Sequence, residues 1–188
     1  MSRDKKKPEP TFETNEIPEP KPGVPALEIT DLNVRFPSED GIVHAVRGVG
    51  LSVQSGEVLG IVGESGSGKS VTSMSVMGLL DESANITGSV KLHGVELLGR
   101  SDAWMSQIRG KKLAMVFQDP LSSLNPVFTI GDQIAEALQI HDHKISDKDA
   151  QARALELLKA VGIPNPEVRI KNFPHEFSGG MRQRVMIA

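Results

Sequence analysis

The sequence of 188 residues contains no cysteine, which excludes disulfide bonds, thiolate metal sites and cysteine nucleophiles. It contains no apolar run that approaches the roughly 20 residues a helix needs to cross a bilayer, and its N-terminus lacks the apolar middle of a signal peptide. The net charge is −3, so no overall positive field favours nucleic acid. We therefore expect a chain that stays in the cytosol, binds no nucleic acid and reaches a membrane only through a partner.

What the sequence does contain is a phosphate-binding pattern. Residues 63–70 fit G-x-x-x-x-G-K-[ST] and read Gly63-Glu64-Ser65-Gly66-Ser67-Gly68-Lys69-Ser70. The apolar run 58–62 before the pattern suits a buried strand, and residues 71–80 after it contain no proline and can form a helix. Strand, glycine-rich loop and helix in this order predict a nucleotide site. The alternative is a glycine-rich turn that only happens to end in Lys-Ser.

Each residue type in this loop has a chemical reason. Gly63, Gly66 and Gly68 permit backbone angles that are closed to other residues, so successive N–H groups can surround an anion. The helix that begins near Lys69 adds the positive end of its dipole. Lys69 is predicted to reach the β- and γ-phosphates, and the Ser70 hydroxyl is predicted to ligate Mg²⁺.

The N-terminal part of the chain predicts an arm followed by strands. Residues 1–25 are rich in charge and proline and are predicted to be a disordered arm. Alternating apolar residues predict strands at 27–36 and 43–53, and residues 86–98 predict a hairpin. The continuous apolar run 113–117 predicts a second buried central strand.

The C-terminal part is predicted to be helical. Helices with capping serine or threonine are expected to begin after Thr129 and Ser146. The fold class is therefore predicted to be α/β, with a nucleotide-binding core, an antiparallel β portion and a helical insertion.

A second candidate anion site lies near the end of the sequence. Ser178, Gly179 and Gly180 precede a predicted helix, so a hydroxyl, exposed backbone N–H groups and a helix N-terminus converge there. The same residues fit equally well a serine that caps the helix and binds no ligand.

Together these motifs resemble the ATP-binding subunit of an ABC transporter. Residues 63–70 match the Walker A loop, Gln118 matches the Q-loop glutamine, and residues 178–183 match the ABC signature. The stretches 117–126 and 173–188 are similar to one subgroup, the oligopeptide, dipeptide and nickel importers. The resemblance covers about residues 26–188 and implies a P-loop NTPase fold of the ABC ATPase type.

The resemblance also implies roles for individual residues. Phe36 matches the aromatic position that stacks on adenine; the alternative is a phenylalanine on a strand that packs in the hydrophobic core. Gln118 would contact Mg²⁺ and the attacking water. Ser178, Gly179 and Gly180 would clamp the γ-phosphate of ATP held by a second subunit. Glu64, Ser65 and Ser67 would bind ATP with the rest of the Walker A loop.

Partners follow from the same resemblance. It implies a head-to-tail dimer with a homologous ATP-binding subunit, two transmembrane permease subunits, and indirect contact with an extracytoplasmic solute-binding protein. The subunit would lie at the cytoplasmic face of the cell membrane and couple ATP hydrolysis to uptake of peptides. A soluble ABC ATPase without a transport role, or a fragment that does not hydrolyse ATP, is the alternative.

The resemblance divides the chain into parts. These are the arm 1–25 and a partial ATP-binding domain 26–188, which comprises 26–118 (β portion and P-loop core), 119–177 (Q-loop and helical subdomain) and 178–188 (signature). The sequence has no Asp-Glu strand end of the Walker B type after the signature, and the chain alone is expected to lack ATPase activity.

Overall fold

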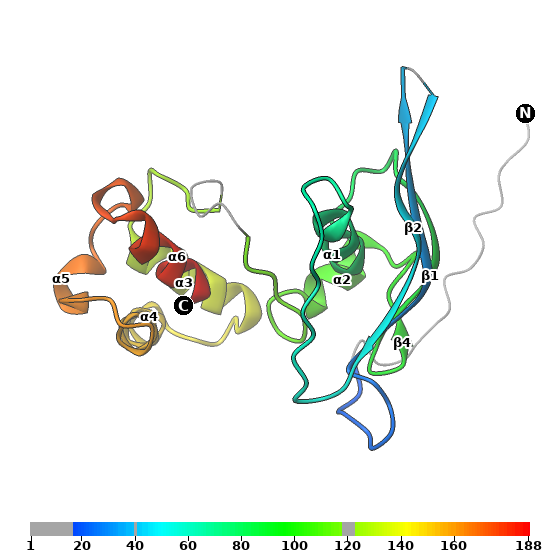
Figure 1. The fold of residues 1–188 in the computed structure, drawn as a ribbon. Coiled ribbons are helices and arrows are strands. Elements are labelled where there is room, and N and C mark those ends of the chain that lie inside the picture. Colours follow the sequence, from blue (N-terminus) through cyan, green and yellow to red (C-terminus); the bar gives the residue numbers. More distant parts are fainter. Residues whose placement is uncertain (1–16, 40, 118–122) are drawn as a thin grey trace, which may run out of the picture. The chain divides into compact units, whose positions relative to one another are not determined.

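The computed structural model describes residues 17–39, 41–117 and 123–188. The chain consists of two compact units, which are divided in the sequence between Leu113 and Ala114. The first unit combines an antiparallel sheet with helices, and the described part of the second consists of helices and connecting loops (Figure 1). The division predicted from the sequence, after residue 118, lies a few residues later.

The sheet of the first unit is built on a long hairpin. Strands β1 (Leu27–Ser38) and β2 (Gly41–Val53) pair in antiparallel fashion, and β3 (Asn85–Leu92) pairs with the other edge of β1. The short strand β4 (Val95–Glu96) extends the sheet, whose order is β2-β1-β3-β4. The strands and the hairpin predicted from alternating residues are confirmed.

An irregularity interrupts the β1–β2 pairing near Gly48. The register shifts between Leu32 and Val34, and Gly48 has a φ of 63°, in the left-handed region. Its backbone N–H donates a hydrogen bond to the side-chain oxygen of Asn33 at 2.9 Å. The bulge that the glycines of this segment indicate is therefore present.

Helices α1 (Lys69–Met77) and α2 (Asp102–Ile108) lie on one face of this sheet (Figure 1). Apolar side chains between the sheet and the helices form the core of the unit. Its buried members are Ile17, Ile29, Leu32, Val34, Val46, Val76, Val90, Leu92, Leu97, Met105 and Ile108. This core fixes α1, and with it the end of the glycine-rich loop, against the sheet.

The two predicted central strands are not formed in the described residues. Residues 58–62 make no strand pairing, and Val58 and Val62 are each 95 % exposed. Residues 114–117 are also unpaired, and Leu113 makes only an isolated bridge to Arg109. A strand exists through hydrogen bonds to a neighbouring strand, and no described segment lies in position to supply them. The prediction of buried strands here is wrong for this structure.

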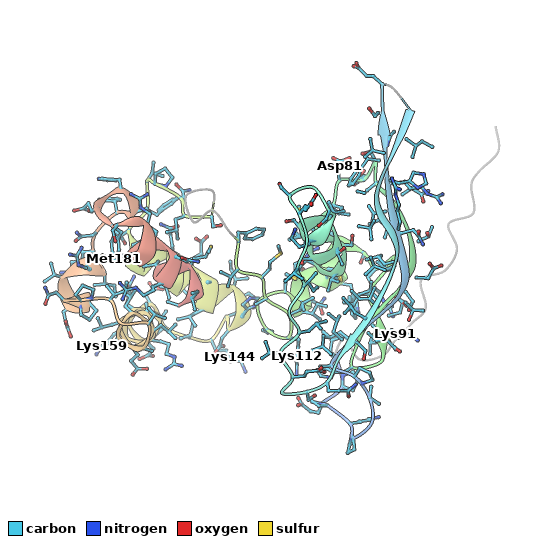
Figure 2. All side chains as sticks on the ribbon, in the orientation of Figure 1. Asp81, Lys91, Lys112, Lys144, Lys159 and Met181 are labelled. Atoms are coloured by element: carbon cyan, nitrogen blue, oxygen red, sulfur yellow. The ribbon has the colours of Figure 1, made fainter. Side chains whose placement is uncertain are left out.

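The predicted disordered arm is wrong for its last residues. Ile17 is 3 % exposed and belongs to the core of the first unit. Glu19 forms an ion pair at 2.9 Å with Lys112, which is labelled in Figure 2. A buried isoleucine and a paired carboxylate tie residues 17–25 to the unit, and residues 1–16 lie outside the described part of the chain.

Glu96 holds the β3–β4 hairpin together. Its carboxylate accepts hydrogen bonds from the Ser89 hydroxyl at 2.5 Å, from the Val90 N–H at 2.9 Å and from the Leu98 N–H at 3.0 Å. Partial burial raises the pKa of Glu96, but these hydrogen bonds outweigh it and hold the pKa below its ordinary value. The ionised form therefore stabilises the fold.

We predict that Glu96→Gln lowers the free energy of unfolding of this unit by about 1 kcal/mol at neutral pH, because the carboxylate is only partly withdrawn from water. A depressed pKa adds stability above the unfolded-state value and loses it as the pH falls through the folded-state value. The difference between parent and variant should therefore shrink from about pH 5 to about pH 3. Urea unfolding at both ends of this range measures it, with exposed Glu82→Gln as the charge-matched control. A difference that does not change with pH would contradict this role.

In the second unit, capping residues begin the two longest helices. Thr129 caps α3 (Ile130–His141) by accepting a hydrogen bond from the N–H of Asp132, and Ser146 caps α4 (Asp147–Ala160) in the same way through Asp149. Both predicted helix starts are confirmed.

A separate core joins the helices of this unit. Its buried members are Ile130, Ile134, Ala154, Leu158, Ile163, Phe177 and Val185. The short helix α5 (Pro166–Arg169) is joined to α4 by an ion pair at 2.8 Å between Glu167 and Lys159, the latter labelled in Figure 2. A 3-10 turn, Pro174–Glu176, leads to α6 (Gly179–Ile187).

Two arginines anchor α6 inside the unit. Arg182 donates to the carbonyl oxygen of Pro174 at 2.8 Å, and Arg184 donates to the carbonyl oxygen of Gly162 at 2.6 Å. Both acceptors are backbone groups, so the position of α6 depends on the guanidinium geometry of these side chains. No helix in the described part of the chain has the length and apolar character that a membrane crossing requires.

Candidate functional site

The glycine-rich loop ends at an uncapped helix start. The N-cap of α1 is Gly68, which has no side chain to accept a hydrogen bond, whereas Ser101, Thr129, Ser146 and Ser178 cap α2, α3, α4 and α6. The first N–H groups of a helix have no partner inside the helix. At α1 they are thus free of side-chain capping, at the positive end of the helix dipole, where an anion is favoured.

Two glycines of the loop adopt the left-handed backbone expected of them. Gly66 has a φ of 82° and Gly68 a φ of 90°. Gly63 has an ordinary φ, but a Cβ there would lie 2.7 Å from the Ser67 hydroxyl. A side chain at any of these positions would strain the loop or crowd it.

Lys69 folds its ammonium group back over the loop. Its Nζ donates hydrogen bonds to the carbonyl oxygens of Gly63 and Glu64, each at 2.7 Å, and to the Ser67 hydroxyl at 3.2 Å. The charge is therefore held inside the curve of the loop, beside the free end of α1. The positive end of a helix dipole and an ammonium group thus lie at the same loop, which suits a polyphosphate.

Ser70 is exposed on the first turn of α1. Among the described residues no group of three or more His, Cys, Asp or Glu side chains could hold a metal ion. Mg²⁺ commonly keeps several waters and binds through one or two protein ligands together with substrate phosphates. A single exposed hydroxyl next to a phosphate loop fits that mode of binding.

A cavity of about 400 Å³ adjoins the loop. It lies in the first unit and is lined by His44, Ala45, Val46, Arg47, Val49, Gly66 and Ser67. A methyl group at Gly68 would overlap the carbonyl oxygen of Ala45, so the loop packs directly against β2. The β2 residues of this cavity were not predicted from the sequence, because only the pairing in space brings them beside the loop.

Phe36 has surroundings that fit the core reading. It is half-buried, packs against the hydrophobic core of the first unit and pairs across the hairpin with Val43. It is not among the residues that line the cavity. Its proposed contact with a nucleobase stays a prediction.

The second candidate anion site lies in the other unit. The Ser178 side chain caps α6 by accepting a hydrogen bond from the N–H of Met181, a residue labelled in Figure 2. Gly179 and Gly180 are exposed, and a Cβ at either would meet no atom within 4 Å. The start of α6 is therefore capped and open to solvent. This arrangement fits both alternatives, an anion site and a capping serine that binds no ligand. Gln118 lies outside the described residues.

Comparison with known proteins places these features in a family. The family described as ABC transporter matches residues 46–188. The chain is 56 % identical over 164 residues to the oligopeptide transport ATP-binding protein OppD of Mycobacterium tuberculosis, covering 87 % of this chain and 27 % of that protein. It is 51 % identical over 164 residues to OppD of Bacillus subtilis, covering 86 % of this chain and 46 % of that protein.

A solved structure shows the same fold. A dimeric ATP-binding cassette in a post-hydrolysis state, bound to ADP and Pi, is 26 % identical and has a TM-score of 0.73, covering 86 % of this chain and 67 % of that chain. The chain spans between about a quarter and a half of the length of the OppD relatives named above. The expected fold class, a P-loop α/β fold of the ABC ATPase type, is confirmed by this likeness, although the two central strands are not formed.

Proposed function

Because this chain belongs to the ABC transporter family, whose sequence model matches residues 46–188, we propose that it binds ATP as part of an importer's ATP-binding subunit. The observation that carries the proposal is the Lys69 ammonium, held inside the glycine-rich loop at the uncapped start of α1. The names of its relatives point to oligopeptides as the transported solute.

Different residues of the loop would bind the phosphates of ATP and the Mg²⁺ ion. The backbone N–H groups of residues 63–70 bind the phosphate oxygens, and Lys69 pairs with the β- and γ-phosphates. The Ser70 hydroxyl would supply one ligand to Mg²⁺, and the ion would neutralise charge on the phosphates. Lys69 must then exchange the carbonyl oxygens of Gly63 and Glu64 for phosphate oxygens, which are stronger acceptors because they are charged.

The start of α6 would act on a second ATP molecule. Ser178, Gly179 and Gly180 present an open helix N-terminus that fits a γ-phosphate held by the loop of another ATP-binding subunit. The related cassette was solved as a dimer, which supports this arrangement. Gln118 is proposed to contact Mg²⁺ and the attacking water.

The proposed assembly contains two permease subunits, two ATP-binding subunits and, indirectly, a solute-binding protein. The permeases would hold this subunit at the cytoplasmic face of the cell membrane. The ATP-driven change in the subunits would then be transmitted to the permeases and allow a peptide to cross.

We predict that deleting the gene from its own organism reduces uptake of a radiolabelled oligopeptide to the level of an uncoupled control. The unaltered gene should restore uptake, and a gene that carries Lys69→Ala should not, because phosphate binding is lost. A gene that carries Lys112→Ala, which changes a lysine of the same unit away from the loop, is the control. Unchanged peptide uptake after deletion would contradict the importer proposal and favour an ABC ATPase without this transport role.

A further inference from the structure

Helix α1 has no capping side chain at its start and no basic residue in its last turn. The last C=O groups of a helix have no partner inside the helix. Gly78, the C-cap, closes the last turn by donating its N–H to the carbonyl oxygen of Ser75 at 3.1 Å. The carbonyl oxygens of Met77 and Gly78 are left for a donor from outside the helix.

That donor is Arg109, which follows Gly78 by 31 residues in the sequence. Its Nε donates to the carbonyl oxygen of Met77 and its Nη2 to that of Gly78, each at 2.9 Å. Its Nη1 forms an ion pair at 2.7 Å with Asp102, the first residue of α2, which lies on the same face of the sheet as α1 (Figure 1). The Arg109 side chain is 20 % exposed. A cation is thus held, by all three guanidinium nitrogens, at the negative end of the α1 dipole.

We propose that Arg109 is a positioning residue for nucleotide binding. By holding the C-terminal end of α1, it would set the direction in which this helix presents Lys69 and Ser70 to the phosphates and to Mg²⁺. The proposal rests on the proposed function, because it requires phosphates in the loop. It adds a residue outside the glycine-rich loop to those that determine the affinity for ATP.

The helix is short and stiff enough to carry this effect from one end to the other. It has nine residues, which at 1.5 Å per residue span about 13 Å, and it contains no glycine or proline that would let it bend. Its buried side chains hold one face against the core of the first unit. Hydrophobic contact is not directional, whereas the hydrogen bonds of a guanidinium fork are. Loss of the fork would therefore let α1 tilt and displace Lys69 and Ser70 at its other end.

The test measures the affinity of the full protein for ATP with Mg²⁺ and with EDTA, by competition with a fluorescent ATP analogue. Arg109→Ala is expected to weaken binding of Mg-ATP about tenfold, the scale of one charge-assisted hydrogen bond. The loss with EDTA should be smaller, because Ser70 contributes only through the ion. Arg109→Lys should recover only part of the loss, because an ammonium group cannot reproduce the fork on two carbonyl oxygens.

Two control variants separate positioning from stability. Asp102→Asn leaves both contacts between Arg109 and α1 in place and should change the affinity by less than about twofold, because an exposed carboxylate contributes little through its ion pair. Glu96→Gln destabilises the same unit away from α1 and should change neither affinity. Circular dichroism confirms that each variant is folded at the temperature of the titration.

The parent affinity for Mg-ATP in Arg109→Ala, or in Arg109→Lys if the alanine variant does not fold, would overturn the proposal. A loss that is equal with and without Mg²⁺ and is matched by Glu96→Gln would also overturn it, since Arg109 would then only stabilise the fold. An equal loss in Asp102→Asn would overturn it by transferring the effect from α1 to α2. Failure of Lys69→Ala to weaken binding of Mg-ATP would instead overturn the proposed function.

Discussion

Lys69→Ala is expected to weaken binding of Mg-ATP by about a hundredfold or more. The lysine is the one side-chain cation held inside the described loop, where its Nζ contacts the Gly63 and Glu64 carbonyl oxygens. Each hydrogen bond between charged groups contributes about 1.5–3 kcal/mol, and the ammonium would make such bonds to two phosphates. Titration with a fluorescent ATP analogue measures the loss.

The matched control is Lys112→Ala, which removes a lysine of the same unit that pairs with Glu19. It changes the net charge equally and should leave the affinity for ATP unaltered. Equal affinity of Lys69→Ala and the parent chain for ATP would show that the loop 63–70 is not the phosphate site.

Gly68→Ala is expected to lower the free energy of unfolding of the first unit by about 3 kcal/mol and to abolish ATP binding. Two physical effects add. A φ of 90° costs a residue with a side chain about 1–2 kcal/mol, and the new methyl group would overlap the Ala45 carbonyl, with a cost of about 1–3 kcal/mol for overpacking. Relief of this overlap requires the loop to move away from β2.

Gly56→Ala shows the first effect alone, so the difference between the two variants measures the second effect, the overlap with β2. Gly56 has a φ of 80°, close to that of Gly68, but a Cβ there would meet no atom within 4 Å. This variant should lose only about 1 kcal/mol, the cost of the left-handed backbone, and should bind ATP normally. Thermal unfolding and ATP titration of both variants make the comparison. Equal destabilisation would show that the contact between the loop and β2 does not constrain the site.

The sequence predicted those elements whose signals are local. The strands at 27–36 and 43–53 have alternating residues, and the helices after Thr129 and Ser146 begin with a capping side chain, and the structure contains all four. Such signals depend only on near neighbours in the chain.

The predictions that failed depended on distant partners. Residues 58–62 and 113–117 are apolar enough for central strands, but pairing is required as well, and no described segment pairs with either as a strand. Ile17 joins the core although its surroundings in sequence are charged and rich in proline. One buried side chain and one ion pair, which composition does not reveal, order this part of the arm.

In the candidate site, too, the parts with local sequence signals could be predicted and the parts that depend on distant residues could not. The loop was predicted from a sequence pattern whose residue types and spacing suit phosphate binding. The structure adds where Lys69 places its charge. His44 and Arg47 belong to no sequence motif, and they line the cavity beside the loop only because β2 passes next to Gly66 and Ser67. Capping of α6 by Ser178 follows from local sequence, but a capping serine alone does not identify its ligand.

ATP binding by the loop 63–70 is tested most directly by a structure of the protein with Mg²⁺ and an ATP analogue that resists hydrolysis. We predict that the β- and γ-phosphates occupy the loop 63–70, that the Lys69 Nζ leaves the Gly63 and Glu64 carbonyl oxygens for phosphate oxygens, and that Ser70 contacts Mg²⁺. A nucleotide bound elsewhere, with Lys69 still on both carbonyl oxygens, would contradict it.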